Sequence, residues 1–471
     1  MTTRIVLEDT GFGIRAAVLD GDDRLIEIRD VDRDDPRVTD ALFAARVTAV
    51  DPKLNAAFLD CGLPQPGLIV AKDARAAAGS AERRPIKELL REGQRLIVQG
   101  LREAVGDKGP RFTSDIRLFG YALVHTPLTA TVEVSHQLGR RQADELRERG
   151  RTLFPEGRFV LRRHAARVTD EALMVEAKRL ADRWRRIEAA AKTAKPGRLP
   201  EMESPLERLL RGLIELEPEA VAVADRNLAR ELERLLATPG LPPLELVRLD
   251  PDEPAFAQAG VDAALETALS TLVPLPRGGR LLIEETAACV AIDVDGGGRS
   301  PLDVDLEAAG EIARQVRLRN LGGTILIDFV DLPSKPERQR LEEALRKAFR
   351  HDPAPFEIHP VSSLGTVLVS RARRGQPLSA LLQAACTSCG GSGRRPSPRV
   401  GAERLLGALG RRRRPARVVR VARDLGDFLA DGQGRAAWRH LARCIGYEPP
   451  LVIDPSLAPA SFDLDTRNDG D

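Results

Sequence analysis

Two short stretches of the chain decide its fold: residues 289–293 read Cys-Val-Ala-Ile-Asp, and residues 324–328 read Thr-Ile-Leu-Ile-Asp. Both have the apolar, β-branched composition of buried strands, and each ends in an aspartate. Between them, apolar residues recur at helical spacing over 306–316, with Asp303 or Asp305 as the expected cap of that helix. The unit therefore reads strand, helix, strand.

The two terminal aspartates are expected to lie at one edge of a sheet. If the strands are parallel, a right-handed crossover brings their carboxyl ends together, where open α/β sheets place their ligands. Carboxylates, waters and substrate phosphates are the ligands that Mg²⁺ prefers, so Asp293 and Asp328 are candidate magnesium ligands, with Asp295 as a third. The substrate would then be a phosphoester. The alternative is that these aspartates only form turns or cap helices.

The composition bounds the class of protein. A chain of 471 residues exceeds one hydrophobic core, so we expect three or more domains. Its 72 basic and 70 acidic residues nearly cancel, which excludes a polycation and confines any polyanion site to a local patch. No membrane span or signal peptide is visible, and five scattered cysteines do not suit a disulfide framework. These features predict a soluble protein of the cytoplasm.

A β-rich region extends from residue 42 to about residue 127. Its short apolar runs suit about five strands of an OB barrel, a fold that binds single-stranded nucleic acid. Phe58 and Phe112 are candidates for stacking on bases, and Lys108 is a candidate for contact with phosphate. For Phe112, burial in the core of the barrel is the competing interpretation.

A cysteine pair near the C-terminus has the spacing of a metal knuckle. Cys386 and Cys389 are followed by glycines that let the backbone fold around a metal, so they are candidate zinc ligands. Structural zinc has four ligands, and the remaining cysteines belong to other predicted elements. We therefore expect a Zn²⁺ shared between two copies of the chain. The alternatives are a redox pair or no function.

The same segments resemble the bacterial ribonuclease E/G family, and the resemblance covers practically the whole chain. The resemblance is strongest in the catalytic core and extends to the barrel, the cysteine knuckle and the tail. The segments that carry it are 292–294, 306–315, 318–323 and 327–331 in the core, 56–60 and 107–110 in the barrel, and 386–393 and 454–457 beyond them.

The resemblance implies a multidomain fold of mixed α/β and α+β classes. An RNase H-like subdomain is split around an OB-fold barrel and a 5′ sensor, and a DNase I-like catalytic domain, a zinc-link and a small C-terminal domain follow. The expected boundaries are 1–37 and 201–278 for the RNase H-like parts, 38–127 for the OB fold, 128–200 for the sensor, 279–379 for the catalytic domain, 380–400 for the zinc-link and 401–471 for the small domain.

The resemblance also implies the activity. It predicts a magnesium-dependent endoribonuclease that cleaves single-stranded RNA to 5′-phosphate and 3′-hydroxyl products, in rRNA processing and mRNA decay. The expected assembly is a homodimer or a tetramer built as a dimer of dimers, with zinc shared between protomers. The alternative is an RNA-binding scaffold of the same fold with weakened catalysis.

Individual residues match the family's functional positions. Asp293 and Asp328 match its magnesium-binding catalytic acids, and Arg163 matches the arginine that binds a 5′ monophosphate. Arg373 matches a basic residue near the same 5′-phosphate pocket. The residues that match RNA contacts of the barrel are Phe58 and Lys108.

Several departures from the family pattern make this chain a divergent member. Asp295 stands where the family has an amide that orients a catalytic acid, and Val304-Asp305 replaces Thr-Asn, so we expect a more acidic metal shell. His164 replaces the sensor threonine. The usual hydrogen bond to the 5′ phosphate is then weakened, although an imidazolium at His164 is a candidate phosphate ligand.

Overall fold

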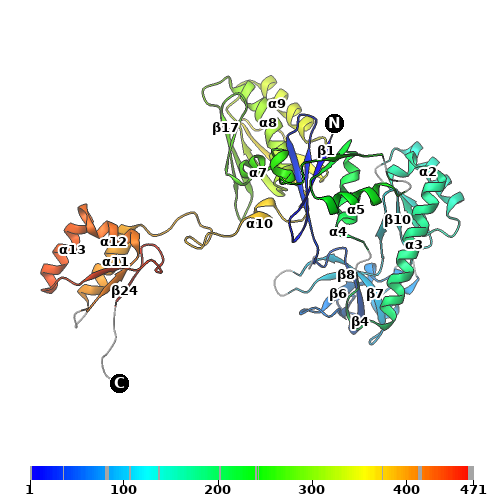
Figure 1. Cartoon of the computed structure of the whole chain (residues 1–471), viewed down its shortest axis with the longest axis horizontal. Coiled ribbons are helices and arrows are strands. Elements are labelled where there is room, and N and C mark those ends of the chain that lie inside the picture. The colour runs from blue at the N-terminus through cyan, green and yellow to red at the C-terminus, as the bar shows by residue number, and fades with distance from the viewer. Residues whose placement is uncertain are drawn as a thin grey trace. The chain divides into compact units, whose positions relative to one another are not determined.

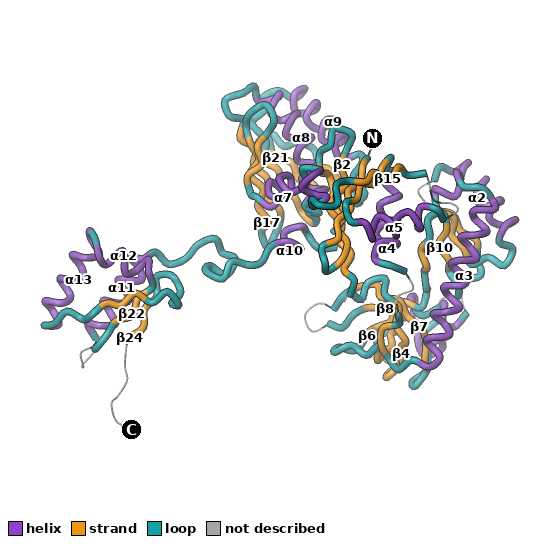
Figure 2. The backbone as a smooth tube through the Cα atoms, in the orientation of Figure 1, coloured by secondary structure: helices purple, strands orange, loops and turns teal. Residues whose placement is uncertain are grey.

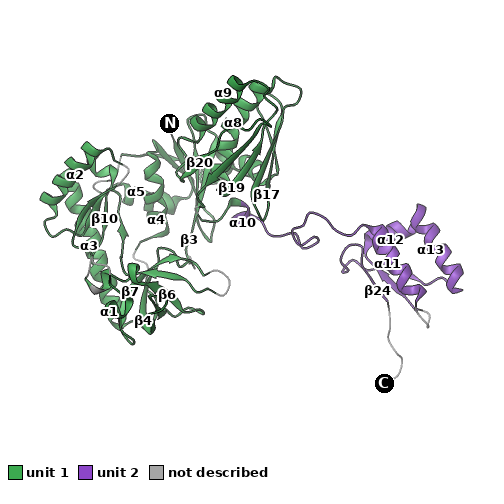
Figure 3. Cartoon of the chain, turned by 180° about the vertical axis from the view of Figure 1, so that it is seen from behind, with its two compact units in different colours: residues 1–378 green, residues 379–471 purple. Residues whose placement is uncertain are grey.

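The computed structural model describes residues 3–34, 37–79, 84–104, 108–135, 138–200, 203–238, 241, 243–373, 375–411 and 416–464. Asp107 of the barrel motif lies outside these ranges. The chain forms two compact units, residues 1–378 and 379–471, which are coloured separately in Figure 3. Helices and strands are mixed throughout, so the expected multidomain α/β class is confirmed. No helix of the described ranges is both long and apolar enough to cross a membrane.

The first sheet is built from two distant parts of the chain. Its five strands follow the order β15-β14-β1-β2-β3, and β1 pairs with β14 in parallel. Helices α4 and α5 share its core, because leucines of both helices pack with β1 and β14. The elements are β1 (Arg4–Asp9), β2 (Gly13–Leu19), β3 (Leu25–Asp32), α4 (Pro205–Leu213), η4 (Ile214–Leu216), β14 (Ala220–Val223), α5 (Arg226–Leu236) and β15 (Glu245–Arg248).

The second sheet closes into a five-stranded OB-like barrel, as the sequence predicts. The strands follow the order β4-β5-β6-β8-β7, and the pairing of β4 with β7 closes the ring. Strand β13 extends β4 at the edge. The elements are β4 (Leu42–Asp51), β5 (Ala56–Asp60), β6 (Gly67–Val70), η1 (Ala71–Asp73), η2 (Ala76–Ala78), α1 (Ile86–Leu89), β7 (Arg95–Arg102), β8 (Arg111–Thr113) and β13 (Gly197–Arg198).

A small four-stranded sheet is formed by the part of the chain that follows the barrel strands and precedes α4 and β14 of the first sheet. Its order is β11-β12-β10-β9, and it packs on the long helix α3, whose N-terminus is capped by the Thr169 hydroxyl. The short helix η3 follows β12 directly. The elements are β9 (Leu118–Phe119), β10 (Leu123–His125), β11 (Val132–Val134), α2 (Arg140–Leu153), β12 (Phe159–Leu161), η3 (Arg163–Arg167) and α3 (Asp170–Thr193).

The third large sheet contains the strand-helix-strand unit. Its order is β16-β17-β18-β19-β21-β20, and only β18 and β19 pair in parallel among its described strands. Helices α8 and α9 pack on one face of it (Figures 1 and 2). The elements are α6 (Ala255–Gln258), α7 (Val261–Leu269), β16 (Leu272–Pro274), β17 (Arg280–Glu285), β18 (Val290–Asp295), α8 (Pro301–Leu318), β19 (Gly323–Asp328), α9 (Lys335–Phe349), β20 (Phe356–Ile358) and β21 (Thr366–Arg371).

Helix α8 ties this sheet to the first one through ion pairs. The Glu311 carboxylate is nearly buried and binds Arg24, 2.6 Å away, and Arg314 of its own helix. One turn further, Arg317 binds Glu27 of β3 at 2.7 Å. These contacts join segments almost 290 residues apart, so the orientation of α8 depends on the N-terminal strands.

The second unit is a small α+β domain. Three helices pack on a three-stranded sheet of order β23-β22-β24 around a core that includes Leu405, Val419 and Trp438. The elements are α11 (Pro398–Gly410), β22 (Val419–Val421), α12 (Arg423–Ala430), α13 (Gly432–Ile445), β23 (Leu451–Ile453) and β24 (Phe462–Leu464); α10 (Leu378–Leu382) precedes them.

The start of α8 differs from the sequence-based expectation. The helix begins at Pro301 after Ser300, so neither Asp303 nor Asp305 caps it. Asp305 is instead 0% exposed: its Oδ1 accepts the N–H of Val330 at 3.1 Å, and its Oδ2 is buried without a hydrogen-bond partner among the described residues. Burial raises the pKa of Asp305 to about 7, because the charged form is poorly solvated there.

We predict that Asp305→Asn stabilises the protein at alkaline pH. The folded-state pKa of Asp305 lies above its ordinary value of 3.8, so the wild type loses stability as pH rises from about 4 to about 7 and gains none above that. Asparagine keeps the bond from Val330 and cannot ionise. Thermal melting between pH 5 and pH 8.5 should show a gain for the variant that grows with pH, on the order of 1–3 kcal/mol at its maximum.

The matched control is Asp303→Asn, an exposed position in the same helix. It should not reproduce the pH-dependent gain. Equal melting temperatures of the wild type and Asp305→Asn across this pH range would contradict the assignment of a buried carboxyl group with a raised pKa.

Candidate functional site

Asp293 and Asp328 lie directly opposite each other on neighbouring strands. Strands β18 and β19 pair in parallel with Asp293 in register with Asp328, and such strands are about 4.8 Å apart. Both side chains are exposed, whereas Ile292 and Ile327 beside them are buried against α8. The parallel pairing assumed from the sequence is therefore confirmed. It places two carboxylates side by side on the open face of the sheet.

The neighbours of this carboxylate pair in the same row of the sheet are uncharged. In the same row across the sheet, Leu282 of β17 lies opposite Asp293, and Thr366 of β21 lies opposite Asp328. The Thr366 hydroxyl is engaged by Ser362 at 2.6 Å. Among the described residues, neither aspartate forms an ion pair or a side-chain hydrogen bond. Like charges directly opposite each other destabilise a sheet, so this arrangement favours a bound cation.

Asp295 is engaged in other contacts. Its Oδ2 lies 2.9 Å from an Nη of Arg280, and its Oδ1 accepts the N–H of Gly297 in the following turn. Within the described ranges, no group of three or more His, Cys, Asp and Glu side chains converges on a common point. Asp293 and Asp328 are therefore acids of this sheet edge without a side-chain partner among the described residues, whereas Asp295, the last residue of β18, is already paired.

Arg163 and His164 begin the short helix η3. The Arg163 guanidinium donates to the carbonyl oxygen of Glu215 and lies 3.9 Å from the Glu217 carboxylate. The His164 ring is 2% exposed and stacks on Tyr121, with 4.8 Å between the ring centroids. Burial, followed by the charge of Arg163, lowers the pKa of His164 to about 4. The ring is therefore neutral at pH 7, which disfavours the imidazolium considered from the sequence.

Arg373 lies at a different element. Its side chain is exposed and packs against Gly322 and Gly323, where β19 begins. No contact given by the structure joins it to Arg163. The two arginines that the family resemblance places at one phosphate pocket therefore lie on η3 and beside β19, respectively.

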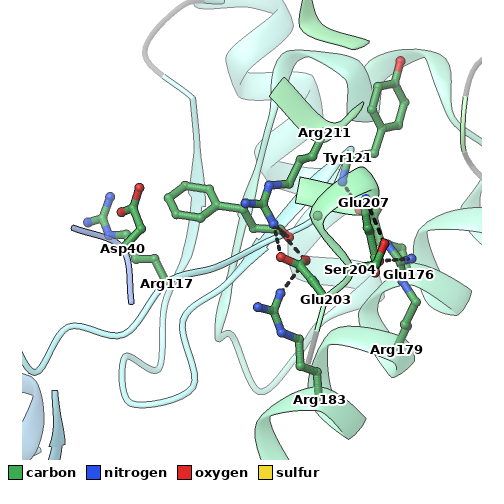
Figure 4. A network of polar contacts seen from close by, with 12 residues as sticks. Asp40, Arg117, Tyr121, Glu176, Arg179, Arg183, Glu203, Ser204, Glu207 and Arg211 are labelled. Carbon is green, nitrogen blue, oxygen red and sulfur yellow. Dashed lines mark hydrogen bonds and ion pairs between the residues drawn. The ribbon is translucent and has the colours of Figure 1, made fainter. Parts of the chain in front are cut away.

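A buried glutamate of α3, which the sequence reasoning did not identify, holds Tyr121 in place. One Oε of Glu176 accepts the N–H of Tyr121 (Figure 4). Both oxygens accept the N–H of Ala122 at 3.1–3.2 Å. A side chain at Gly120 would collide with the same carboxylate. The sequence contains one indication of this role: Glu176 follows the buried Leu173 by three residues, so it falls on the apolar face of the helix.

The same figure shows two arginines that share one carboxylate. Arg183 lies 2.5 Å from one oxygen of Glu203, and Arg211 lies 2.6 Å from the other (Figure 4). They line a cavity of about 260 Å³ that the sequence did not predict. Its arginines are Arg37, Arg117, Arg183, Arg198, Arg208 and Arg211.

The barrel residues differ in exposure. Phe58 of β5 is half-buried beside Leu68 of β6, and Lys108 is exposed. Phe112 is 0% exposed and meets the ring of Phe43 edge to face at 5.3 Å. The expectation that Phe112 contacts RNA is therefore not supported, because its ring belongs to the core of the barrel.

Cys386 and Cys389 lie in one tight turn, in which Cys386 is exposed and Cys389 is half-buried. The N–H of Cys389 donates to the carbonyl oxygen of Cys386 at 3.4 Å. The N–H groups of Ser388 and Cys389 point at the Cys386 sulfur, which lowers the pKa of that thiol. Gly390 and Gly391 then take left-handed conformations, with φ of 58° and 88°. A thiolate stabilised by backbone N–H groups at the start of such a turn fits a zinc ligand.

Comparison with known proteins identifies the family. The profile of the ribonuclease E/G family matches residues 117–374. Ribonuclease G of Salmonella typhimurium (strain SL1344) is 30% identical over 420 residues, which are 83% of this chain and 84% of that protein. Ribonuclease G of Haemophilus influenzae is 30% identical over 75% of this chain and 76% of that protein. Ribonuclease E of Escherichia coli (strain K12) is 31% identical over 81% of this chain but only 38% of that protein. These matches show that the chain belongs to the ribonuclease E/G family.

Proposed function

We propose that this protein is an endoribonuclease of RNA processing that cleaves single-stranded RNA with Mg²⁺ held by Asp293 and Asp328. Its family and the names of its relatives, ribonuclease G and ribonuclease E, support the activity. The observation that carries the metal assignment is the pair of in-register carboxylates on the exposed face of the sheet, neither of which forms an ion pair among the described residues. Two carboxylates with waters and a substrate phosphate suit Mg²⁺.

The proposed chemistry is hydrolysis of a phosphodiester. When bound, the metal would polarise a phosphoryl oxygen and lower the pKa of an attacking water. Asp293 and Asp328 would supply the negative charge that holds it. On the same face, Leu326 of β19 and Leu368 of β21 are exposed and lie opposite each other, which leaves this surface open to an RNA strand. Water adds to phosphorus as the 3′ oxygen leaves with a proton, so the products are a 5′ phosphate and a 3′ hydroxyl.

Other residues are proposed to position the RNA. The half-exposed ring of Phe58 can stack on a base, and Lys108 can meet a backbone phosphate. Arg163 is the proposed contact of a 5′ phosphate. Arg373 lies beside the start of β19, so it is a second proposed contact for an RNA that extends to that strand. His164 would support this site as a neutral packing partner. The proposed cellular roles are rRNA processing and mRNA decay.

Zinc is proposed to join two copies of the chain. Each copy would contribute Cys386 and Cys389, which gives the four thiolates of a closed structural site. The alternative function, a scaffold that binds RNA without cutting it, is less favoured because both carboxylates are present and exposed.

We predict that Asp293→Asn and Asp328→Asn each lower kcat for cleavage of a single-stranded RNA by at least about 100-fold, because each removes charge from the metal site. Circular dichroism and melting should show an intact fold. Cleavage is measured against Mg²⁺ concentration, and the mutants should need more metal. Glu284→Gln is the matched control: it removes an exposed carboxylate from β17 of the same sheet and should cut within a few-fold of the wild type. Wild-type rates in either aspartate variant would refute the metal assignment.

We predict that purified protein contains about half a zinc ion per chain. Cys386→Ser should lose that zinc and shift the protein to a smaller species in light scattering. Cys444→Ser, at another exposed cysteine, is the control and should retain both the metal and the size. A metal-free protein that keeps its oligomeric state would contradict the shared zinc site.

A further inference from the structure

Three arginines around η3 are paired with two glutamates from a distant segment. Arg162 forms an ion pair with Glu215, and an Nη of Arg167 lies 3.0 Å from the Glu217 carboxylate. Arg163, between them in sequence, is 3.9 Å from the same Glu217 oxygen. Arg163, the proposed contact of a 5′ phosphate, therefore already lies beside a carboxylate of the protein itself, that of Glu217.

The backbone of Glu217 is firmly placed. It follows η4, whose Ile214 is buried in the core of the first sheet, and its N–H donates to the Ile214 carbonyl oxygen at 2.9 Å. Its φ of 51° is left-handed, a conformation that costs a residue with a Cβ free energy. Its side chain is 48% exposed, so the ion pairs that it forms with Arg163 and Arg167 are open to solvent.

The opposite side of the site is also fixed and contributes no extra positive charge. Glu176 holds the backbone of Tyr121, and the Tyr121 ring stacks on His164, whose Nε2 lies 3.3 Å from the Nε of Arg163 (Figure 4 shows Glu176 and Tyr121). Because the buried His164 is neutral at pH 7, it cannot offset Glu217. The ion pairs around η3 therefore set three guanidiniums against two carboxylates.

We infer that Glu217 is an internal occupant of the 5′-phosphate site and makes this enzyme only weakly selective for the RNA 5′ end. The inference rests on the proposed contact between Arg163 and a 5′ phosphate. A terminal monophosphate carries close to two negative charges at pH 7, so it must displace the Glu217 carboxylate and is repelled by it. RNAs that begin with a hydroxyl group or enter internally meet no such competition.

The test compares one RNA sequence with a 5′ monophosphate, a 5′ triphosphate or a 5′ hydroxyl. For the wild type, we expect kcat/KM for the monophosphate to exceed that for the hydroxyl by less than about 3-fold. Glu217→Gln keeps the shape and removes the charge, and it should raise this ratio by about 3- to 10-fold, since exposed ion pairs are individually weak. Glu219→Gln, an exposed neighbour without contact to the arginines, should leave the ratio unchanged.

A second measurement does not depend on cleavage. Fluorescence anisotropy with a short labelled oligonucleotide should show that Glu217→Gln binds the 5′-monophosphorylated form several-fold more tightly than the wild type does, relative to the 5′-hydroxyl form. Equal ratios in the wild type and Glu217→Gln, by cleavage and by binding, would overturn the role of Glu217. If no RNA is cleaved at all, the nuclease proposal fails. The ratio of affinities for the 5′-monophosphorylated and 5′-hydroxyl oligonucleotides would still show whether Glu217 opposes binding of the phosphate.

Discussion

The in-register parallel pairing of β18 with β19 is the constraint on which the candidate site depends. Side chains alternate between the faces of a strand, so a slip of one residue would bury an aspartate and expose an isoleucine. The burial of Ile292 and Ile327 against α8 opposes that slip and keeps both carboxylates on the open face. Helix α8 is itself held by Glu311 and Arg317 through their partners on or beside β3. The register of the acidic pair is thus fixed by the core between this sheet and α8, and ion pairs hold α8 against the first sheet.

The parts of the fold that depend on local patterns could be predicted from the sequence. The strand-helix-strand unit and the barrel follow from short-range periodicity and turn residues. The other domains were expected only because the chain resembles the ribonuclease E/G family. The predicted cap of α8 was wrong, because proline suits the first helical turn and the helix begins at Pro301. Asp305 therefore lies inside the helix, where it is buried. Hydrophobic spacing alone does not reveal which polar residue is covered in this way.

The contacts that modify the sites could not be predicted, because they join residues far apart in the chain. Arg163 and Glu217 are separated by more than fifty positions in the sequence. The same holds for Tyr121, whose N–H donates to Glu176 of helix α3. Phe112 is a similar case: a phenylalanine in a barrel strand has the same local pattern whether its ring faces the core or a nucleic acid. Motif matching gives the residue type at each position, whereas charge pairing and burial decide what that residue can do.

The split first sheet has a consequence for synthesis of the chain on the ribosome. Strands β1 to β3 emerge first, but the second partner of β1 is β14, which follows the barrel and α3. At about 5–20 residues per second, the ribosome needs on the order of ten seconds or more to reach β14. During that interval an apolar strand edge has no partner within the nascent chain, and such edges promote aggregation. The inserted domains therefore lengthen the period in which a chaperone would benefit this protein.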